Sequence, residues 1–209
     1  MVENVDDMKV VNQFEEEIAK YSGSKYGIVI SSCTNAIFLS LQYLLSIGEL
    51  KKGDTIICPS HTFLSVPCQL KLCGFKIKFE DFTWSGIYKL DPTRVFDCAT
   101  RFTKGMFVGG NALQCLSFQY RKHLKIGRGG AVITNDKDAV RWLKMARING
   151  RHEGVSQADE ELEFCGWNMY MTSEQISRGL TLLACLPEVN PDCGNNELYP
   201  NISNQRVFK

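Results

Sequence analysis

The stretch Ser117-Phe-Gln-Tyr-Arg-Lys122-His-Leu-Lys-Ile-Gly127-Arg-Gly129-Gly130 is the most informative part of this 209-residue chain. Apolar segments flank it at residues 113–118 and 131–134. A connection with no helix in it favours an antiparallel pair of strands. The amine of a lysine held in such a loop can be desolvated, and a desolvated amine is a usable nucleophile for Schiff-base chemistry. The alternative is that Lys122 belongs to an ordinary solvated basic loop that attracts anions.

Strand-like and helix-like segments alternate along the rest of the chain. Strands are expected at residues 26–30, 55–58, 76–79, 94–96, 113–118 and 131–134. The spacing of apolar residues predicts helices at 11–21, 34–45, 63–73, 137–148 and 172–183. This alternation predicts an α/β fold with a mostly parallel, mixed sheet and helices on both faces.

Composition sets the broad class. Hydrophobic residues make up 44% of the chain and charged residues 22%, as in an ordinary soluble globule. A net charge of +1 gives no reason to expect nucleic-acid or membrane partners. The acidic N-terminus has no apolar signal region, so a cytoplasmic location is expected, with the nine cysteines reduced. The three histidines lie far apart in sequence, which gives a metal site little support.

The composition changes near the C-terminus. After Leu186 the chain is rich in Pro, Asn, Asp and Gly. We therefore expect one domain over residues 1–186 and a mostly irregular tail over residues 187–209. Residues 150–161 are expected to form a mobile polar loop.

Four other segments contain candidate site residues. Asp97 ends an apolar strand, where a carboxylate either caps a turn or contacts a ligand. Residues 31–36, Ser-Ser-Cys-Thr-Asn-Ala, join a strand to a helix, and N–H groups there can cap the helix or bind an anion. Phe63 ends the segment Pro-Ser-His-Thr-Phe, and taken alone it would be interpreted as a core residue. Asn168 lies in the segment Gly-Trp-Asn-Met-Tyr-Met, and taken alone it would be interpreted as a turn residue.

In this order, the five segments resemble the DegT/DnrJ/StrS family of PLP-dependent sugar-nucleotide aminotransferases. The resemblance covers about residues 9–186, and five collinear segments are far more specific than any single motif. It implies the large domain of a fold-type-I PLP-dependent transferase, with the family's small C-terminal domain largely missing. It also implies pyridoxal 5′-phosphate as the cofactor.

The resemblance assigns a role to each candidate residue. It implies that Lys122 forms the Schiff base with the cofactor and that Asp97 holds the pyridinium nitrogen. Phe63 is expected to stack on the ring, and Thr100 stands where relatives carry Gln or His beside the cofactor's hydroxyl. The remaining matched positions are assigned to the phosphate: Cys33, Thr34 and Ser117 within one chain, and Asn168 from the neighbouring subunit.

The resemblance also implies a reaction and an assembly. An amino acid, expected to be glutamate, would donate an amino group to a keto-sugar nucleotide in a homodimer with shared active sites. Family members that carry histidine in place of the lysine are dehydratases, so Lys122 favours amino transfer although His123 is adjacent. A dinucleotide fingerprint must open a helix, whereas the Gly127–Gly130 loop precedes a strand, which argues against a nicotinamide enzyme.

Two departures from the family pattern leave an alternative open. The family has an additional strand and helix where residues 83–93 form a short bridge, and little of its small C-terminal domain is expected beyond residue 186. Separately, Cys33 stands where the family's phosphate turn has a glycine. The alternative is a PLP-binding relic or regulatory protein of the same fold without transaminase activity.

Overall fold

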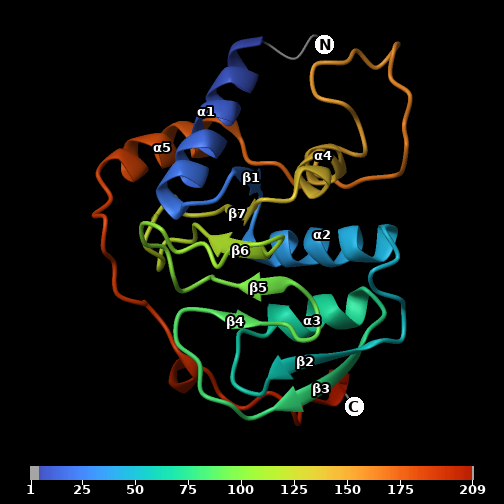
Figure 1. Cartoon of the computed structure of the whole chain (residues 1–209), viewed down its shortest axis with the longest axis vertical. Helices are drawn as coiled ribbons and strands as arrows, with labels where there is room; N and C mark the ends of the chain where they lie inside the picture. The colour runs from blue at the N-terminus through green and yellow to red at the C-terminus, as the bar shows by residue number, and fades with distance from the viewer. Residues whose placement is uncertain (1–4, 209) are drawn as a thin grey trace.

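The computed structural model describes residues 5–208 of the chain (Figure 1). The helices are α1 (Val5–Ser22), α2 (Cys33–Ser46), α3 (Ser65–Leu72), α4 (Lys137–Ala146) and α5 (Ser173–Ala184). The strands are β1 (Tyr26–Ile30), β2 (Thr55–Pro59), β3 (Lys76–Glu80), β4 (Tyr88–Lys89), β5 (Val95–Asp97), β6 (Leu113–Ser117) and β7 (Gly130–Thr134). Every expected helix and strand is present, and β4 is an addition.

The sheet is mixed, as predicted. Five strands lie in the order β1-β7-β6-β5-β4, and β2 and β3 form a separate parallel pair. Within the larger sheet β5 and β6 are parallel, while β1–β7, β6–β7 and β4–β5 are antiparallel. Strands β1, β5 and β6 therefore run in one direction, and the two that turn back through short connections, β4 and β7, run against it. Parallel pairing is accordingly less frequent than predicted.

Helices cover both faces of the sheet (Figure 1). Ile28 and Ile30 of β1 pack with α2, α3 and α4, whereas Val29 between them packs on the opposite side with α1 and α5. This alternation follows from the two-residue period of a strand. Both faces of β1 and β7 are buried, and these two strands consist mainly of apolar residues.

Local capping sets several helix boundaries. Thr172 and Gln175 form a capping box at the start of α5, and the Asp136 carboxylate accepts the N–H groups of Asp138 and Ala139 at the start of α4. Helix α3 begins at Ser65, later than expected from the sequence. Pro67 then falls in the first turn, where its missing N–H costs no helical hydrogen bond.

The C-terminal segment is mostly irregular, with two short 3-10 turns at Asn196–Leu198 and Arg206–Phe208. It runs back across the body of the molecule. Cys193 N–H donates to Thr100 O at 2.9 Å, and Ile202 N–H donates to Ser60 O at 2.9 Å. The segment therefore packs against residues that the sequence places near the candidate site. Within residues 5–208, no helix is long and apolar enough to cross a bilayer.

Candidate active site

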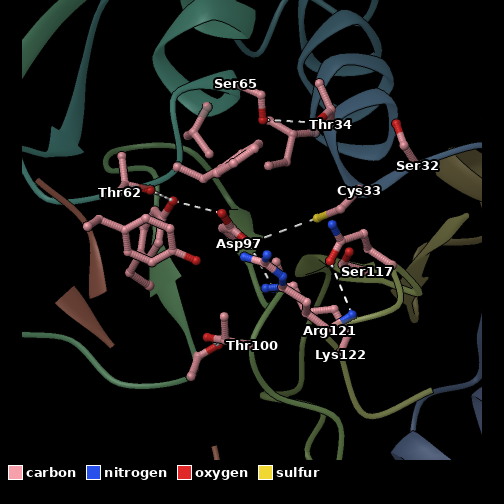
Figure 2. A pocket seen from close by; sticks show the side chains of 18 of the residues that line it. Ser32, Cys33, Thr34, Thr62, Ser65, Asp97, Thr100, Ser117, Arg121 and Lys122 are labelled. Atoms are coloured by element: carbon pink, nitrogen blue, oxygen red, sulfur yellow. Dashed lines mark hydrogen bonds between the residues drawn. The ribbon is translucent and has the colours of Figure 1, made fainter. Parts of the chain in front are cut away.

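A cavity of about 280 Å³ lies where the ends of β5 and β6 meet the N-termini of α2 and α3 (Figure 2). Seven of the eight candidate residues line it: Cys33, Thr34, Phe63, Asp97, Thr100, Ser117 and Lys122. They come from four separate segments of the chain, residues 33–34, 63, 97–100 and 117–122. This convergence of polar side chains in one hollow is typical of a small-molecule site.

Asp97 lies at the base of the cavity and is 6% exposed. Its Oδ2 accepts a hydrogen bond from the Tyr88 hydroxyl at 2.7 Å, and its Oδ1 accepts the Ala99 N–H at 2.8 Å. Burial raises the pKa of this carboxyl above its ordinary value, while these two hydrogen bonds and the positive charge of Lys122 act to lower the pKa. The two hydrogen bonds and the Lys122 charge each favour the ionised carboxylate, and a cationic ligand group in the cavity would favour it further.

The lysine loop joins β6 to β7 as an antiparallel connection, with Ser117 paired to Gly130. Phe118 N–H donates to Gly129 O at 3.0 Å, and Gly127 N–H donates to Phe118 O at 3.0 Å, which closes the base of the loop. Gly127 and Gly129 have φ values of +115° and +113°, a region in which an L side chain is strained. The glycines of the sequence motif therefore allow the turn that places Lys122 at the cavity.

The two residues at the loop tip point differently. Lys122 is half-buried and lines the cavity, whereas His123 does not line it. The Nε2 of His123 contacts Pro191 O at 2.8 Å, on the C-terminal segment. A carbonyl can only accept a hydrogen bond, so this nitrogen carries a proton and is directed away from the cavity.

The N-terminus of α2 forms the opposite wall. Ser32 caps the helix by accepting the Asn35 N–H at 3.1 Å, and the Thr34 hydroxyl donates to Ser65 Oγ at 2.9 Å. The first N–H groups of a helix have no intrahelical partner, and the helix dipole adds partial positive charge there. Ser117 lines the same cavity from β6. The arrangement suits an anion.

The side chain of Cys33 contacts Asp97, which a glycine at this position could not do. Its thiol points into the protein, 3.5 Å from Cys115 O and 3.9 Å from Asp97 Oδ1 (Figure 2). Burial and the neighbouring Asp97 charge raise the pKa of this thiol well above its ordinary value. Cys33 is therefore a protonated, weak hydrogen-bond donor beside Asp97, a position that motif matching did not predict.

Aromatic side chains form the outer wall. Phe63 is 58% exposed and lies edge-on to Tyr199, with ring centroids 6.5 Å apart. Trp84 stacks on Tyr199 at 5.8 Å and contacts Tyr88 at 4.8 Å. Such rings can pack against a flat heteroaromatic ligand.

Thr100 is buried and lines the cavity. Its hydroxyl is within donating distance of Gly86 O at 3.2 Å and Gly194 O at 3.1 Å. The hydroxyl hydrogen is therefore donated to a backbone carbonyl, and the hydroxyl oxygen can only accept a hydrogen bond from a ligand.

Asn168 lies apart from this cavity. It is exposed and borders a second hollow of about 550 Å³, which Arg147, Arg151 and the start of α5 also line. The adjacent Met169 O accepts the Ser31 N–H at 2.8 Å, so the segment runs behind the α2 turn. Within one chain Asn168 does not reach the site.

Sequence reasoning did not select several residues that line the cavity, among them Tyr88, Tyr199, Arg121 and Arg128. The two arginines lie in the lysine loop and could have been selected as basic neighbours of Lys122. Tyr88 and Tyr199 belong to the short bridge and to the C-terminal segment, where no matched motif pointed to them.

The protein is therefore an α/β protein in which a lysine loop, a buried aspartate and a helix N-terminus converge on one cavity, as in an enzyme active site. Residues 4–109 and 95–193 match the DegT/DnrJ/EryC1/StrS aminotransferase family, and the chain belongs to this family. The predicted family resemblance is thus confirmed.

Two curated relatives show how far the likeness extends. The chain is 34% identical over 184 residues to the GDP-4-keto-6-deoxy-D-mannose 3-dehydratase of Escherichia coli O55:H7, across 67% of this chain and 47% of the relative. It is 25% identical over 228 residues to the spore coat polysaccharide biosynthesis protein SpsC of Bacillus subtilis, across 86% of this chain and 57% of that protein. The chain spans about half the length of these relatives.

Solved structures confirm the fold. A GDP-4-keto-6-deoxymannose-3-dehydratase variant with bound GDP-perosamine superposes with a TM-score of 0.69 at 21% identity, covering 86% of this chain and 61% of the other. AtS13 from Actinomadura melliaura superposes with a TM-score of 0.72 at 18% identity, covering 84% and 60%. The predicted fold-type-I large domain is therefore the observed architecture.

Proposed function

We propose that this chain binds pyridoxal 5′-phosphate and transfers an amino group from an amino acid, expected to be glutamate, to a keto-sugar nucleotide. The family and the resemblance to PLP enzymes support the cofactor. Structures of GDP-4-keto-6-deoxymannose-3-dehydratase carry hydrated PLP or PLP trapped with glutamate. When bound, the cofactor supplies an aldehyde that takes up an amine and a ring that withdraws electrons from the adjacent carbon.

The residues lining the cavity fit this cofactor. Asp97 is a buried carboxylate with only two short hydrogen bonds, so lone pairs remain for a protonated ring nitrogen. Lys122 supplies the amine for the aldehyde, and the first turn of α2 with Ser117 supplies donors for the phosphate. Phe63 and Tyr199 offer ring faces beside them.

The observation that carries the proposal is the opposite orientation of Lys122 and His123. Lys122 faces the cavity, and His123 is held against Pro191. A lysine amine there can both bind the cofactor and accept the proton from the α-carbon of the amino donor at Nζ. This placement favours amino transfer over the dehydratase chemistry named for the relative from E. coli.

The basic residues at the cavity rim support anionic substrates. Arg121 and Arg128 are exposed and line the opening beside Lys122. Their guanidinium groups can pair with the carboxylate of an amino donor or the phosphates of a nucleotide. We further propose a homodimer, because Asn168 lies on an exposed segment outside its own chain's cavity.

Covalent trapping tests the proposal. After incubation with PLP and borohydride, peptide mapping should place the reduced adduct on Lys122. Lys125→Ala should retain the adduct and Lys122→Ala should lose it, since Lys125 is an exposed lysine of the same loop outside the cavity lining. An adduct on Lys125, or none, would refute the assignment.

A second measurement separates the enzyme from a PLP-binding relic. Addition of glutamate should shift the visible absorption band of the PLP-loaded protein as the amine is transferred. A trapped Lys122 adduct whose band does not respond to any amino acid would identify the relic instead.

A further inference from the structure

The short bridge before β5 brings a tyrosine to the candidate cofactor site. Tyr88 lies on β4, directly opposite Asp97 in the antiparallel β4–β5 ladder. Residues opposite one another in such a ladder project from the same face of the sheet. Tyr88 and Asp97 are each 6% exposed, and both line the cavity. The register of β4 thus fixes the tyrosine hydroxyl next to the carboxylate.

The hydrogen bonds form a directed chain. Tyr88 Oη is 2.7 Å from Asp97 Oδ2 and 2.5 Å from Thr62 Oγ1. An ionised carboxylate can only accept, so Tyr88 donates to Asp97 and Thr62 donates to Tyr88. Burial and the Asp97 charge raise the pKa of Tyr88 well above its ordinary value, which keeps its hydroxyl protonated as a donor.

We propose that Tyr88 is a positioning residue for Asp97: its hydroxyl fixes the rotation of the carboxylate so that a free lone pair faces the ring nitrogen of the cofactor. The inference rests on the proposed function. Ala99 N–H holds Oδ1 and Tyr88 holds Oδ2. With both oxygens anchored, the carboxylate cannot turn without breaking a buried hydrogen bond, which is costly.

The test compares PLP with its carbocyclic analogue, in which a C–H group replaces the ring nitrogen. Tyr88→Phe should weaken PLP binding about tenfold, in line with loss of a hydrogen bond to a charged group. Binding of the analogue should stay within about twofold of the wild-type value, because the analogue makes no contact that depends on Asp97 orientation. In an Asp97→Asn background, Tyr88→Phe should cause no further loss for PLP.

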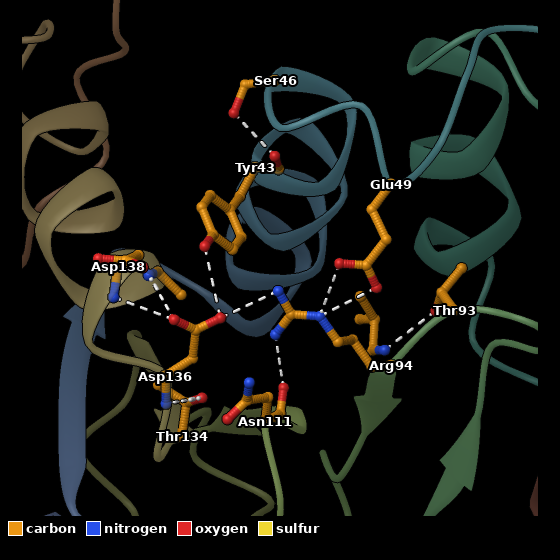
Figure 3. Close-up of polar contacts among 11 residues, drawn as sticks. Tyr43, Ser46, Glu49, Thr93, Arg94, Asn111, Thr134, Asp136 and Asp138 are labelled. Carbon is orange, nitrogen blue, oxygen red and sulfur yellow. Dashed lines mark hydrogen bonds and ion pairs between the residues drawn. The ribbon is translucent and has the colours of Figure 1, made fainter.

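Tyr43→Phe is the matched control. Tyr43 is also a buried tyrosine beside an aspartate, with its hydroxyl 3.4 Å from Asp136 Oδ2 (Figure 3). Neither Tyr43 nor Asp136 lines the cavity. Removing this hydroxyl should therefore leave the affinities for both PLP and the analogue unchanged.

Thr62→Val preserves the shape of the side chain but removes the hydroxyl that donates to Tyr88. This variant should lose less PLP affinity than Tyr88→Phe and should keep its affinity for the analogue.

The protonation of the Asp97 carboxylate can also be measured directly, in protein without cofactor. The carboxyl ¹³C signal of Asp97 in the unloaded protein should titrate at higher pH in Tyr88→Phe, because the lost hydrogen bond favoured the ionised form. It should be unchanged in Tyr43→Phe. An unchanged Asp97 titration in Tyr88→Phe, or equal losses for PLP and its analogue, would overturn the positioning role while leaving the proposed function intact. Wild-type protein that binds no PLP would overturn both.

Discussion

Gly130 lies directly against the N-terminus of α2: a β-carbon on Gly130 would be 2.5 Å from the backbone nitrogen of Cys33. The same β-carbon would be 2.5 Å from Leu116 O. Gly130 begins the strand that follows the lysine loop, and Cys33 begins the helix at the opposite wall. Backbone contact between them fixes the distance between the lysine loop and the candidate phosphate turn.

Gly130→Ala should therefore damage both stability and cofactor binding. The clashing atoms belong to the backbone and cannot rotate away, so we expect a destabilisation of about 1–3 kcal/mol, as for other overpacked sites. PLP affinity should fall with it, because α2 and the loop are forced apart. Thermal unfolding and PLP titration provide the two readouts.

Gly48→Ala is the control for a loss of stability away from the cavity. Gly48 has a φ of +74° and no atom within 4 Å of an added β-carbon. This variant should lose about 1 kcal/mol of stability and keep its PLP affinity. If Gly130→Ala bound PLP as tightly as the wild type, the close contact would have no bearing on the site.

The proposed homodimer can be tested by subunit complementation. Lys122→Ala and Asn168→Ala chains should each be inactive, and co-refolding them should restore about a quarter of wild-type activity, since half of randomly assembled dimers are mixed and carry one intact site of two. The reason is that a shared site takes its lysine from one chain and its asparagine from the other. Transaminase assays on the refolded mixture measure the recovery.

The control for this experiment uses two residues of the same cavity. Lys122→Ala mixed with Asp97→Asn should show no recovery, because both residues line one chain's cavity and every mixed site lacks one of them. Recovery in this control would show that the restored activity does not report how the two chains share a site. No recovery in the Lys122→Ala and Asn168→Ala mixture, or a wild-type monomer fully loaded with PLP, would exclude a shared site.

Cys193 is expected to be the most reactive exposed thiol. Partial burial raises its pKa, but a hydrogen bond with His123 and the positive charges of His123 and Lys122 outweigh this and lower the pKa below the ordinary thiol value. The same hydrogen bond raises the pKa of His123. A lower thiol pKa means more thiolate at neutral pH, and the thiolate is the reactive form.

Iodoacetamide at pH 7 should thus alkylate Cys193 several times faster than Cys165 or Cys185, the other two exposed cysteines. His123→Gln should slow Cys193 and move its pH–rate midpoint upward. Peptide mass spectrometry at several times and pH values measures both effects. Equal rates for the three thiols, or a His123→Gln variant with the wild-type profile, would show that the histidine does not activate Cys193.

The sequence alone determined the secondary structure and the main candidate residues. The antiparallel pair around Lys122 followed from a connection with no helix in it, and the turn that makes it depends on Gly127 and Gly129. Helix ends followed from capping residues such as Thr172. These features are local, because each depends on a few neighbouring residues and their backbone preferences.

Tertiary structure alone decided how the candidate residues are held. Tyr88 contacts Asp97 only because β4 pairs with β5 in one register, and a shift by one residue would turn the tyrosine to the other face. Tyr199 reaches the same cavity because the C-terminal segment folds back across the site. Neither residue lies in a recognisable motif. Their contacts depend on packing between distant segments, which side-chain pattern and spacing do not specify.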